Sequence, residues 1–194
     1  MADRWDELRT DRLLLRHWRQ SDREPFAAMN ADPDVMRHFP APLDAAASDA
    51  FADRVEAHLE ARGWGLWAVE LLQHNHFIGF VGLTPVPDDL PSAPAVEIGW
   101  RLAAAYWGNG YAPEAGRAAL RVAFEGLHLP EVVSFTTTLN TPSRRVMSKL
   151  GLRHHPERDF DHPRCAGWHG QRHVLYAMSD AEWGAREQAP APAG

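Results

Sequence analysis

Apolar residues recur along this chain with two different spacings, and the spacing predicts the type of each element. Short apolar or β-branched runs predict strands at residues 12–16, 64–72, 76–83, 95–102 and 132–139. Apolar positions recur every four residues from Phe51 to Leu59 and predict a helix. Asp44 and Gly63 are its expected N-cap and C-terminal end. Asn75 lies between the second and third runs and predicts a tight hairpin.

Charged and turn-forming residues predict the remaining boundaries. Ser21-Asp-Arg-Glu24 has the spacing of a capping box, and Asp32-Pro33 predicts the start of another short helix. Four prolines and two aspartates between residues 85 and 94 predict a surface loop. From residue 95 to 139 a strand, a helix and a strand follow one another, which predicts a parallel crossover, whereas the hairpin predicts antiparallel pairing. We therefore expect an α/β domain with a mixed sheet and no internal repeat.

Two glycines lie between the predicted strand at 95–102 and the helix that follows it, in the sequence Tyr106-Trp-Gly-Asn-Gly-Tyr-Ala-Pro-Glu-Ala115. A strand, a glycine loop and a helix can bind an anion, because the first N–H groups of a helix have no intrahelical partner. One such dipole interaction contributes only about 0.3–1 kcal/mol, so tight binding needs several N–H groups around a polyanion. The segment predicts a pyrophosphate site, although a simple turn before a helix also explains it.

Two common nucleotide-binding motifs do not match this segment. A dinucleotide-binding fold has a third glycine, where Pro113 stands here, and an acidic residue at the end of the next strand. The run at 132–139 contains no carboxylate. The loop also lacks the Gly-Lys-Ser/Thr ending of a P-loop. A nucleotide-dependent oxidoreductase is therefore a weak interpretation.

Four segments occur in a characteristic order, namely Val96–Leu102, the glycine loop, the strand at 132–139 and Asn140–Leu152. This order resembles the GNAT superfamily of acetyl-CoA-dependent N-acetyltransferases, and most closely the RimJ/RimL-like branch of ribosomal-protein acetyltransferases. The resemblance extends from Thr10 to Met178. It implies a GNAT fold, a mixed and mostly antiparallel sheet with a splayed central pair of parallel strands and flanking helices. It also implies acetyl-CoA as the co-substrate.

The resemblance further implies which residues bind acetyl-CoA. The family's pyrophosphate loop, Q/R-x-x-G-x-G/A, matches the glycine loop, with Trp107 in the Gln/Arg position. The end of the preceding strand and the start of the later helix complete the set. The residues assigned to acetyl-CoA are Trp100, Arg101, Leu102, Trp107, Gly108, Asn109, Gly110, Tyr111, Ala112, Asn140 and Ser143.

Glu97 is the candidate general base. Alternation along the strand places Glu97, Gly99 and Arg101 on the face opposite the apolar residues, so Glu97 points away from the helix-packed face. Gly99 leaves room for a ligand beside it. The resemblance implies that Glu97 removes the proton of an amine, directly or through water. An ordinary strand carboxylate in solvent or in an ion pair is the alternative.

Asn140-Thr-Pro-Ser143 has the pattern of a helix start, with Asn140 or Thr141 as the cap. Capping alone explains these residues. The resemblance implies that Asn140 binds the pantetheine arm and that Ser143 lies near the sulfur of CoA, where other branches use a tyrosine acid. Because a serine hydroxyl is a weak acid, we expect Ser143 to donate a hydrogen bond or to relay a proton through water.

Aromatic residues and histidines are numerous, with 8 tryptophans and 11 histidines. Four aromatic side chains are candidates for an acceptor pocket, although packing in the core or in a dimer surface fits them equally; they are Phe39, Trp64, Trp67 and Trp168. The pairs His74/His76 and His154/His155 have no cysteine or carboxylate at a zinc spacing. We therefore predict no metal site.

The bulk properties fit a small enzyme. The chain has 194 residues, which we divide into one acetyltransferase domain at 1–183 and a low-complexity tail, expected to be disordered, at 184–194. A net charge of −6 argues against binding to duplex nucleic acid. The lone Cys165 excludes an internal disulfide. The absence of long apolar runs and of an apolar signal segment predicts a cytoplasmic protein without membrane contact. A homodimer is left open.

We therefore predict an N-acetyltransferase that moves an acetyl group from acetyl-CoA to a primary amine by direct attack. The amine belongs either to a protein N-terminus or to a small molecule. The alternative is a non-catalytic module that binds or senses acyl-CoA. Such a module would need the glycine loop but no carboxylate at Glu97.

Overall fold

A nine-stranded mixed sheet forms the centre of the computed structural model, which describes residues 4–188. Along the sheet the strands follow the order β1-β2-β3-β4-β5-β6-β9-β7, and β8 pairs with β9. The pairing is antiparallel except between β5 and β6. The strands are β1 (Glu7–Arg9), β2 (Leu13–Arg16), β3 (Leu66–Leu71), β4 (His76–Pro85), β5 (Val96–Leu102), β6 (Glu131–Thr137), β7 (Arg153–His154), β8 (Phe160–Asp161) and β9 (Arg172–Ser179).

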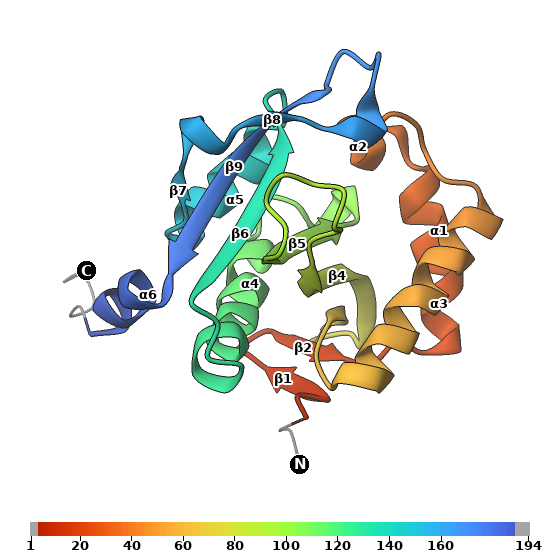
Figure 1. The fold of residues 1–194 in the computed structure, drawn as a ribbon. Coiled ribbons are helices and arrows are strands. Elements are labelled where there is room, and N and C mark those ends of the chain that lie inside the picture. Colours follow the sequence, from red (N-terminus) through yellow and green to blue (C-terminus); the bar gives the residue numbers. More distant parts are fainter. Residues whose placement is uncertain (1–3, 189–194) are drawn as a thin grey trace.

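Helices cover both faces of the sheet. Figure 1 shows α1 and α3 on one side of it and α4 and α5 on the other. The helices are α1 (Arg23–Ala31), α2 (Pro33–Met36), α3 (Ala45–Arg62), α4 (Tyr111–Arg121), α5 (Thr141–Leu150) and α6 (Asp180–Glu187). Short helical turns are η1 (Gln20–Asp22), η2 (Ala104–Tyr106), η3 (Val122–Gly126), η4 (Pro156–Arg158) and η5 (Pro163–Cys165). This arrangement confirms the predicted α/β fold with a mixed sheet.

Several predicted boundaries are confirmed by their hydrogen bonds. The carboxylate of Asp44 accepts the N–H of Ala47 at 2.7 Å, and α3 ends at Gly63 with φ of 71°. Asn75 has a positive φ of 52° in the hairpin between β3 and β4. These residues fix local backbone geometry by themselves, so the sequence predicts them well.

Two expectations were wrong in part, and one short strand was not predicted. The N-terminal capping box does not use Ser21: the carboxylate of Asp22 accepts the backbone N–H of Arg19 at 2.8 Å, and α1 starts after a 3-10 turn. Strand β1 was not predicted, because its three residues contain a single apolar side chain. Helix α6 runs to Glu187 and thus extends into the predicted tail, while the residues from 189 onward lie outside those that the structure describes.

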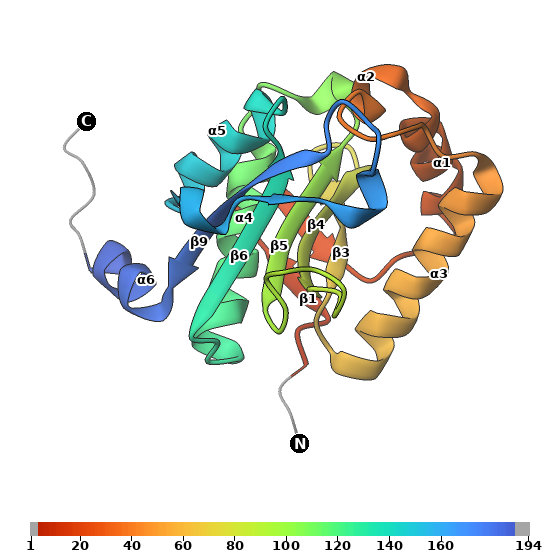
Figure 2. The ribbon, with the colours of Figure 1, turned by 45° about the horizontal axis from the view of Figure 1, so that its top comes forward.

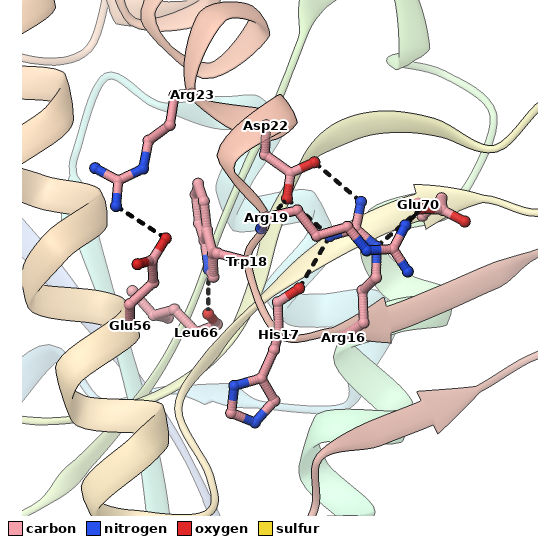
Figure 3. A network of polar contacts seen from close by, with 9 residues as sticks. All are labelled: Arg16, His17, Trp18, Arg19, Asp22, Arg23, Glu56, Leu66 and Glu70. Carbon is pink, nitrogen blue, oxygen red and sulfur yellow. Dashed lines mark hydrogen bonds and ion pairs between the residues drawn. The ribbon is translucent and has the colours of Figure 1, made fainter.

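A buried ion-pair network joins the start of α1 to strands β2 and β3 (Figure 3). The guanidinium of Arg16, on β2, donates to the carboxylate of Asp22 at 2.7 Å and to that of Glu70, on β3, at 2.8 Å. All three side chains are buried. Because each buried charge has a partner of opposite sign, the cost of removing it from water is offset. Trp18 beside them donates from its indole N–H to the carbonyl of Leu66 at 2.9 Å.

No helix within residues 4–188 is long and apolar enough to cross a lipid bilayer. The core lies mainly between the sheet and the helices of both layers. A second, smaller apolar cluster lies around β6, β8 and β9 and the loop after β4. This second cluster includes Val133, which is the register partner of Glu97.

Candidate active site

Strands β5 and β6 diverge in the middle of the sheet. They pair at two positions, the second of which joins Glu97 to Val133. Beyond Glu97, β5 stays paired with β4 as far as Leu102, and β6 stays paired with β9 as far as Thr137. Figure 2 shows the two strands side by side and running in the same direction. Their facing backbone edges therefore carry N–H and C=O groups that an extended ligand with amide groups can pair with.

Glu97 lies at the point where the strands separate, on a face of the sheet that is covered. Register partners point to the same face, so Glu97 points toward the apolar cluster that contains Val133. This cluster comprises Val86, Leu90, Val133, Phe160, Leu175 and Ala177. Arg164 and Asp89 join the segment after β8 to the loop after β4 through two contacts of 2.6 and 3.1 Å. Glu97 is therefore half-buried rather than solvent-exposed.

This environment changes the acidity of Glu97. The pKa of its carboxyl is raised from 4.5 to about 8, because burial disfavours the charged form. A hydrogen bond from the backbone of Phe135 favours the charged form and offsets part of this increase. No cation within the described part of the chain forms an ion pair with Glu97. A carboxyl whose pKa lies near the working pH can both accept and release a proton efficiently.

The glycine loop presents backbone N–H groups without partners. Five consecutive N–H groups, from Gly108 to Ala112, donate no hydrogen bond to any residue that the structure describes. Gly108 and Gly110 have φ of 79° and 80°, in the left-handed region that favours glycine. A Cβ atom at Gly108 would have no atom within 4 Å, so space is open in front of the loop. The loop has the geometry of an anion cradle.

Contacts from the side chains of Arg12 and Trp107 hold the glycine loop in place. Arg12 donates to the carbonyl of Asn109 at 3.0 Å and to the carboxylate of Glu114 at 2.7 Å. Its guanidinium also lies 4.6 Å from the ring centre of Tyr111. The side chain of Trp107 turns back and donates to the carbonyl of Leu102 at 2.7 Å. The loop is therefore fixed before a ligand arrives, and the indole of Trp107 is used for its structure.

Asn140 and Ser143 lie at the start of α5, as predicted. The side chain of Asn140 accepts the N–H of Ser143 at 3.2 Å, which makes Asn140 rather than Thr141 the cap, and it donates to the hydroxyl of Thr136 at 3.0 Å. The hydroxyl of Ser143 forms no hydrogen bond with the described residues. Asn140 thus has a structural role in the fold, while the Ser143 hydroxyl is free to contact a ligand.

Arg101 lies on the same face of β5 as Glu97, two positions beyond Gly99. Its guanidinium donates to the side-chain oxygen of Asn30 at 2.6 Å. It lies 4.4 Å from the ring centre of Phe39, and the rings of Phe51 and Phe80 follow at 5.7 and 5.6 Å. Arg101 therefore points toward α1, α2 and α3. The apolar residues of β5, Trp100 and Leu102 among them, belong to the main core or pack against it.

Only one of the four predicted acceptor-pocket aromatics lies beside Arg101. Phe39 is 38% exposed and packs on its guanidinium. Trp67 is fully buried and donates to a main-chain carbonyl at 2.8 Å, so it belongs to the core and this assignment was wrong. Trp64 packs edge-on against His58. Trp168 lies in the loop after η5, with its ring over Gly170.

Within residues 4–188 no group of three or more histidine, cysteine, aspartate or glutamate side chains has the arrangement of a metal site. Two histidines, His162 and His173, lie with ring centres 4.9 Å apart near Phe135. Burial lowers the pKa of both. They were not singled out from the sequence, and neither were Asn30 and Phe135. No local pattern links any of these residues to Glu97 or Arg101.

The chain is similar to known acetyltransferases. Its residues 12–153 match a family model described as an acetyltransferase (GNAT) domain. It is 32% identical over 185 residues to the FsC-acetyl coenzyme A-N(2)-transacetylase of Aspergillus fumigatus, which covers 91% of this chain and 77% of that protein. It is 31% identical over 147 residues to the uncharacterized protein YkkB of Bacillus subtilis, covering 75% and 84% respectively. A GNAT-family acetyltransferase structure from Bacillus anthracis has a TM-score of 0.76 at 26% identity, over 91% of this chain and 99% of that one.

Proposed function

Because the chain belongs to the GNAT family of acetyltransferases, we propose that it transfers an acetyl group from acetyl-CoA to a primary amine by direct attack of the amine on the thioester. The chain is an acyltransferase enzyme, as its N-acetyltransferase relatives and its fold indicate. The identity of the donor and the class of the acceptor are the parts we propose. Within the family we place the chain in the RimJ/RimL-like branch, on the basis of the segment Asn140–Ser143.

One observation carries the proposal: β5 and β6 separate directly beyond Glu97, and the five free N–H groups of Gly108–Ala112 lie past the far end of β5. A ligand with a pyrophosphate at one end and amide groups along its length fits both features. The cradle can hold the pyrophosphate, and the open strand edges can pair with the amides. CoA has this chemistry. When bound, acetyl-CoA supplies the thioester that the amine attacks.

In this proposal Glu97 accepts the proton of the attacking amine in its ionised form, which becomes the main form as the pH rises through its pKa of about 8. An α-amino group has a pKa near 8 and a lysine amine near 10.4, so at neutral pH much of the acceptor is ammonium and must lose a proton first. The N–C bond forms as the C–S bond breaks, and the departing sulfur needs a proton or a hydrogen bond. In this proposal the hydroxyl of Ser143, in the first turn of α5, donates one, directly or through water.

The test combines an acceptor screen with a substitution of Glu97. The purified protein is incubated with acetyl-CoA and a panel of primary amines and amino-terminal peptides, and thiol release is measured together with the mass of the product. Glu97→Gln should retain CoA binding but lower kcat by roughly 10²–10⁴-fold at pH 7, because the base is lost. Raising the pH should restore part of the rate, since free amine then comes from solution.

Glu60→Gln is the matched control, because Glu60 is an exposed glutamate on α3. It should leave kcat unchanged. If Glu97→Gln acetylates the acceptor at the parent rate from pH 6 to 9, Glu97 is a structural residue and the proposed base is wrong. A cytoplasmic location and a single domain remain predictions from the sequence.

A further inference from the structure

We propose that Arg101, which the resemblance assigned to acetyl-CoA, instead binds a carboxylate of the acceptor, so that the enzyme prefers small amines that carry an anionic group. This inference rests on the proposed function and narrows its substrate class. It starts from a positively charged side chain that is held in place with no acidic partner.

The surroundings of Arg101 contain aromatic rings and neutral polar groups. No ion pair to Arg101 forms within the part of the chain that the structure describes, and its Nε atom is shielded from solvent without a hydrogen-bond partner there. Burial lowers the pKa of Arg101 to about 10, so the guanidinium stays charged at neutral pH. A buried charge is costly unless it is paired, and a carboxylate is the partner that a guanidinium binds best.

A chain of buried amide and hydroxyl groups orients this cation. The side-chain oxygen of Asn30 accepts from Arg101 at 2.6 Å, and its nitrogen donates to the hydroxyl of Ser48 at 2.8 Å. Asn30 and Ser48 are both fully buried. The ring of Phe39 packs against the guanidinium and is itself partly exposed. Asn30 is thus a positioning residue that leaves the charge of Arg101 uncompensated.

The position of Arg101 on β5 relates it to the proposed base. Glu97, Gly99 and Arg101 point to one face, and a Cβ atom at Gly99 would meet no atom within 4 Å. The Cα atoms of Glu97 and Arg101 lie about 13 Å apart at the usual rise of about 3.3 Å per strand residue. An acceptor lying over Gly99 would thus reach both residues, with its amine near Glu97 and its carboxylate at Arg101.

The experiment compares matched acceptors that differ only in charge. The probes are amino acids, dipeptides and tripeptides, each as the free carboxylate and as the C-terminal amide; an extended tripeptide spans about 10 Å. The parent should show a KM for the preferred carboxylates that is roughly 10- to 100-fold lower than for the amides, as expected for a hydrogen bond to a charged group. Arg101→Met should remove this preference and leave the KM for acetyl-CoA unchanged.

Two further variants keep the test decisive if Arg101→Met folds poorly. Asn30→Asp places a carboxylate of nearly the same size against Arg101 and should also abolish the preference, because the cation is then neutralised. Arg121→Gln removes an exposed arginine on α4 and should leave the preference intact. Binding of the same carboxylates in the presence of CoA is measured by calorimetry, which needs no turnover.

The outcomes separate this inference from the proposed function. If the enzyme acetylates amines but has equal KM values for the carboxylates and the amides, this inference alone is overturned. It is also overturned if Arg101→Met raises the KM for acetyl-CoA instead of removing the preference for carboxylates. That last result would assign Arg101 to the co-substrate instead. If no amine of either kind is acetylated and none binds, both proposals are wrong.

Discussion

A carboxyl group enclosed by apolar side chains keeps its proton to a higher pH than one in water, because the charged form loses its hydration. Glu97 is such a group, with apolar neighbours and no cationic partner within the described residues. The same burial that suits it to proton transfer near neutral pH makes the folded protein less stable once the group ionises. Function and stability are therefore opposed at this residue.

The first prediction follows from the sign of this shift. Burial raises the pKa of Glu97 from 4.5 to about 8, so between these values the folded protein holds a proton that the unfolded chain has released. Stability due to this group is present below the lower value and is lost as pH rises through the window. Glu97→Gln is neutral at every pH, so it should be more stable than the parent at pH 9, by an amount on the order of a few kcal/mol.

Urea unfolding at pH 5, 7 and 9 measures this difference. The advantage of Glu97→Gln over the parent should shrink toward pH 5, where the parent carboxyl is protonated as well. Glu60→Gln, at an exposed position, should show no such trend. A constant difference at all three pH values would contradict the raised pKa.

At the scale of elements, α4 and α5 differ in how their first turns are capped. Gly110 precedes the first residue of α4 and offers no side-chain cap, so the first N–H groups of α4 remain available. Asn140 precedes the first residue of α5, and its side chain accepts the N–H of Ser143. The uncapped helix is thus the one suited to bind an anion, and the capped one brings Ser143 to a fixed position.

Substitution of the loop glycines tests the anion cradle. Gly108→Val and Gly110→Val should weaken CoA binding at least tenfold, about 1.4 kcal/mol, because both positions have positive φ and a side chain would crowd the phosphates. Gly184→Ala on α6 is the matched control, since a Cβ there meets no atom within 4 Å and φ is not positive. Calorimetric titration with CoA gives the Kd values. If Gly108→Val and Gly110→Val fold and bind CoA with the parent Kd, the loop is only a turn and does not bind the phosphates.

Substitutions at the start of α5 separate capping from chemistry. Asn140→Ala should lower the free energy of unfolding by about 0.5–2 kcal/mol, because it removes the hydrogen bond to the N–H of Ser143. It should also raise the KM for acetyl-CoA if Asn140 binds the pantetheine arm. Ser143→Ala should leave stability near that of the parent and lower kcat more than CoA affinity. If the activity of both variants falls only in proportion to their loss of stability, these residues only cap the helix.

At the scale of the whole molecule, the site exists only because distant segments meet. The loop after β4 and strands β6, β8 and β9 supply the apolar cluster that contains Val133, the register partner of Glu97. The ion pair between Asp89 and Arg164 connects the loop after β4 to the segment after β8 across 75 positions of sequence. Exposed pairs of this kind contribute little to stability, so the apolar cluster beneath supplies most of the enclosure.

A ligand that binds this assembled site should stabilise the whole domain. At a hundredfold excess over its Kd, CoA should raise the free energy of unfolding by about 2.7 kcal/mol, since it binds the folded state alone. NAD at the same concentration should have little effect, because the loop lacks a third glycine and the next strand lacks an acidic residue. Thermal melting with each ligand provides the measurement. A shift with NAD and none with CoA would contradict the proposed co-substrate.

The sequence by itself determined the features that depend on near neighbours. Asp44 and Gly63 bound α3, Asn75 turns the hairpin, and the glycines at 108 and 110 adopt positive φ, because caps, turns and glycine conformations act within a few residues. The order of motifs also predicted the mixed sheet. The prediction from near neighbours was wrong at Ser21. Its sequence matches a capping box, but the carboxylate of Asp22 accepts the backbone N–H of Arg19 instead.

Only the tertiary structure decided which side chains meet. Arg101 contacts Asn30, 71 positions away in sequence, and Trp67 is buried although its aromatic character fitted a pocket equally well. The burial of Glu97 comes from loops that alternation along β5 cannot reveal. Periodicity reports the face on which a residue lies, whereas the cover over that face is set by topology and long-range packing. For this reason the candidate base could be predicted from the sequence, but its acidity and the lack of an acidic partner for Arg101 within the described residues could not.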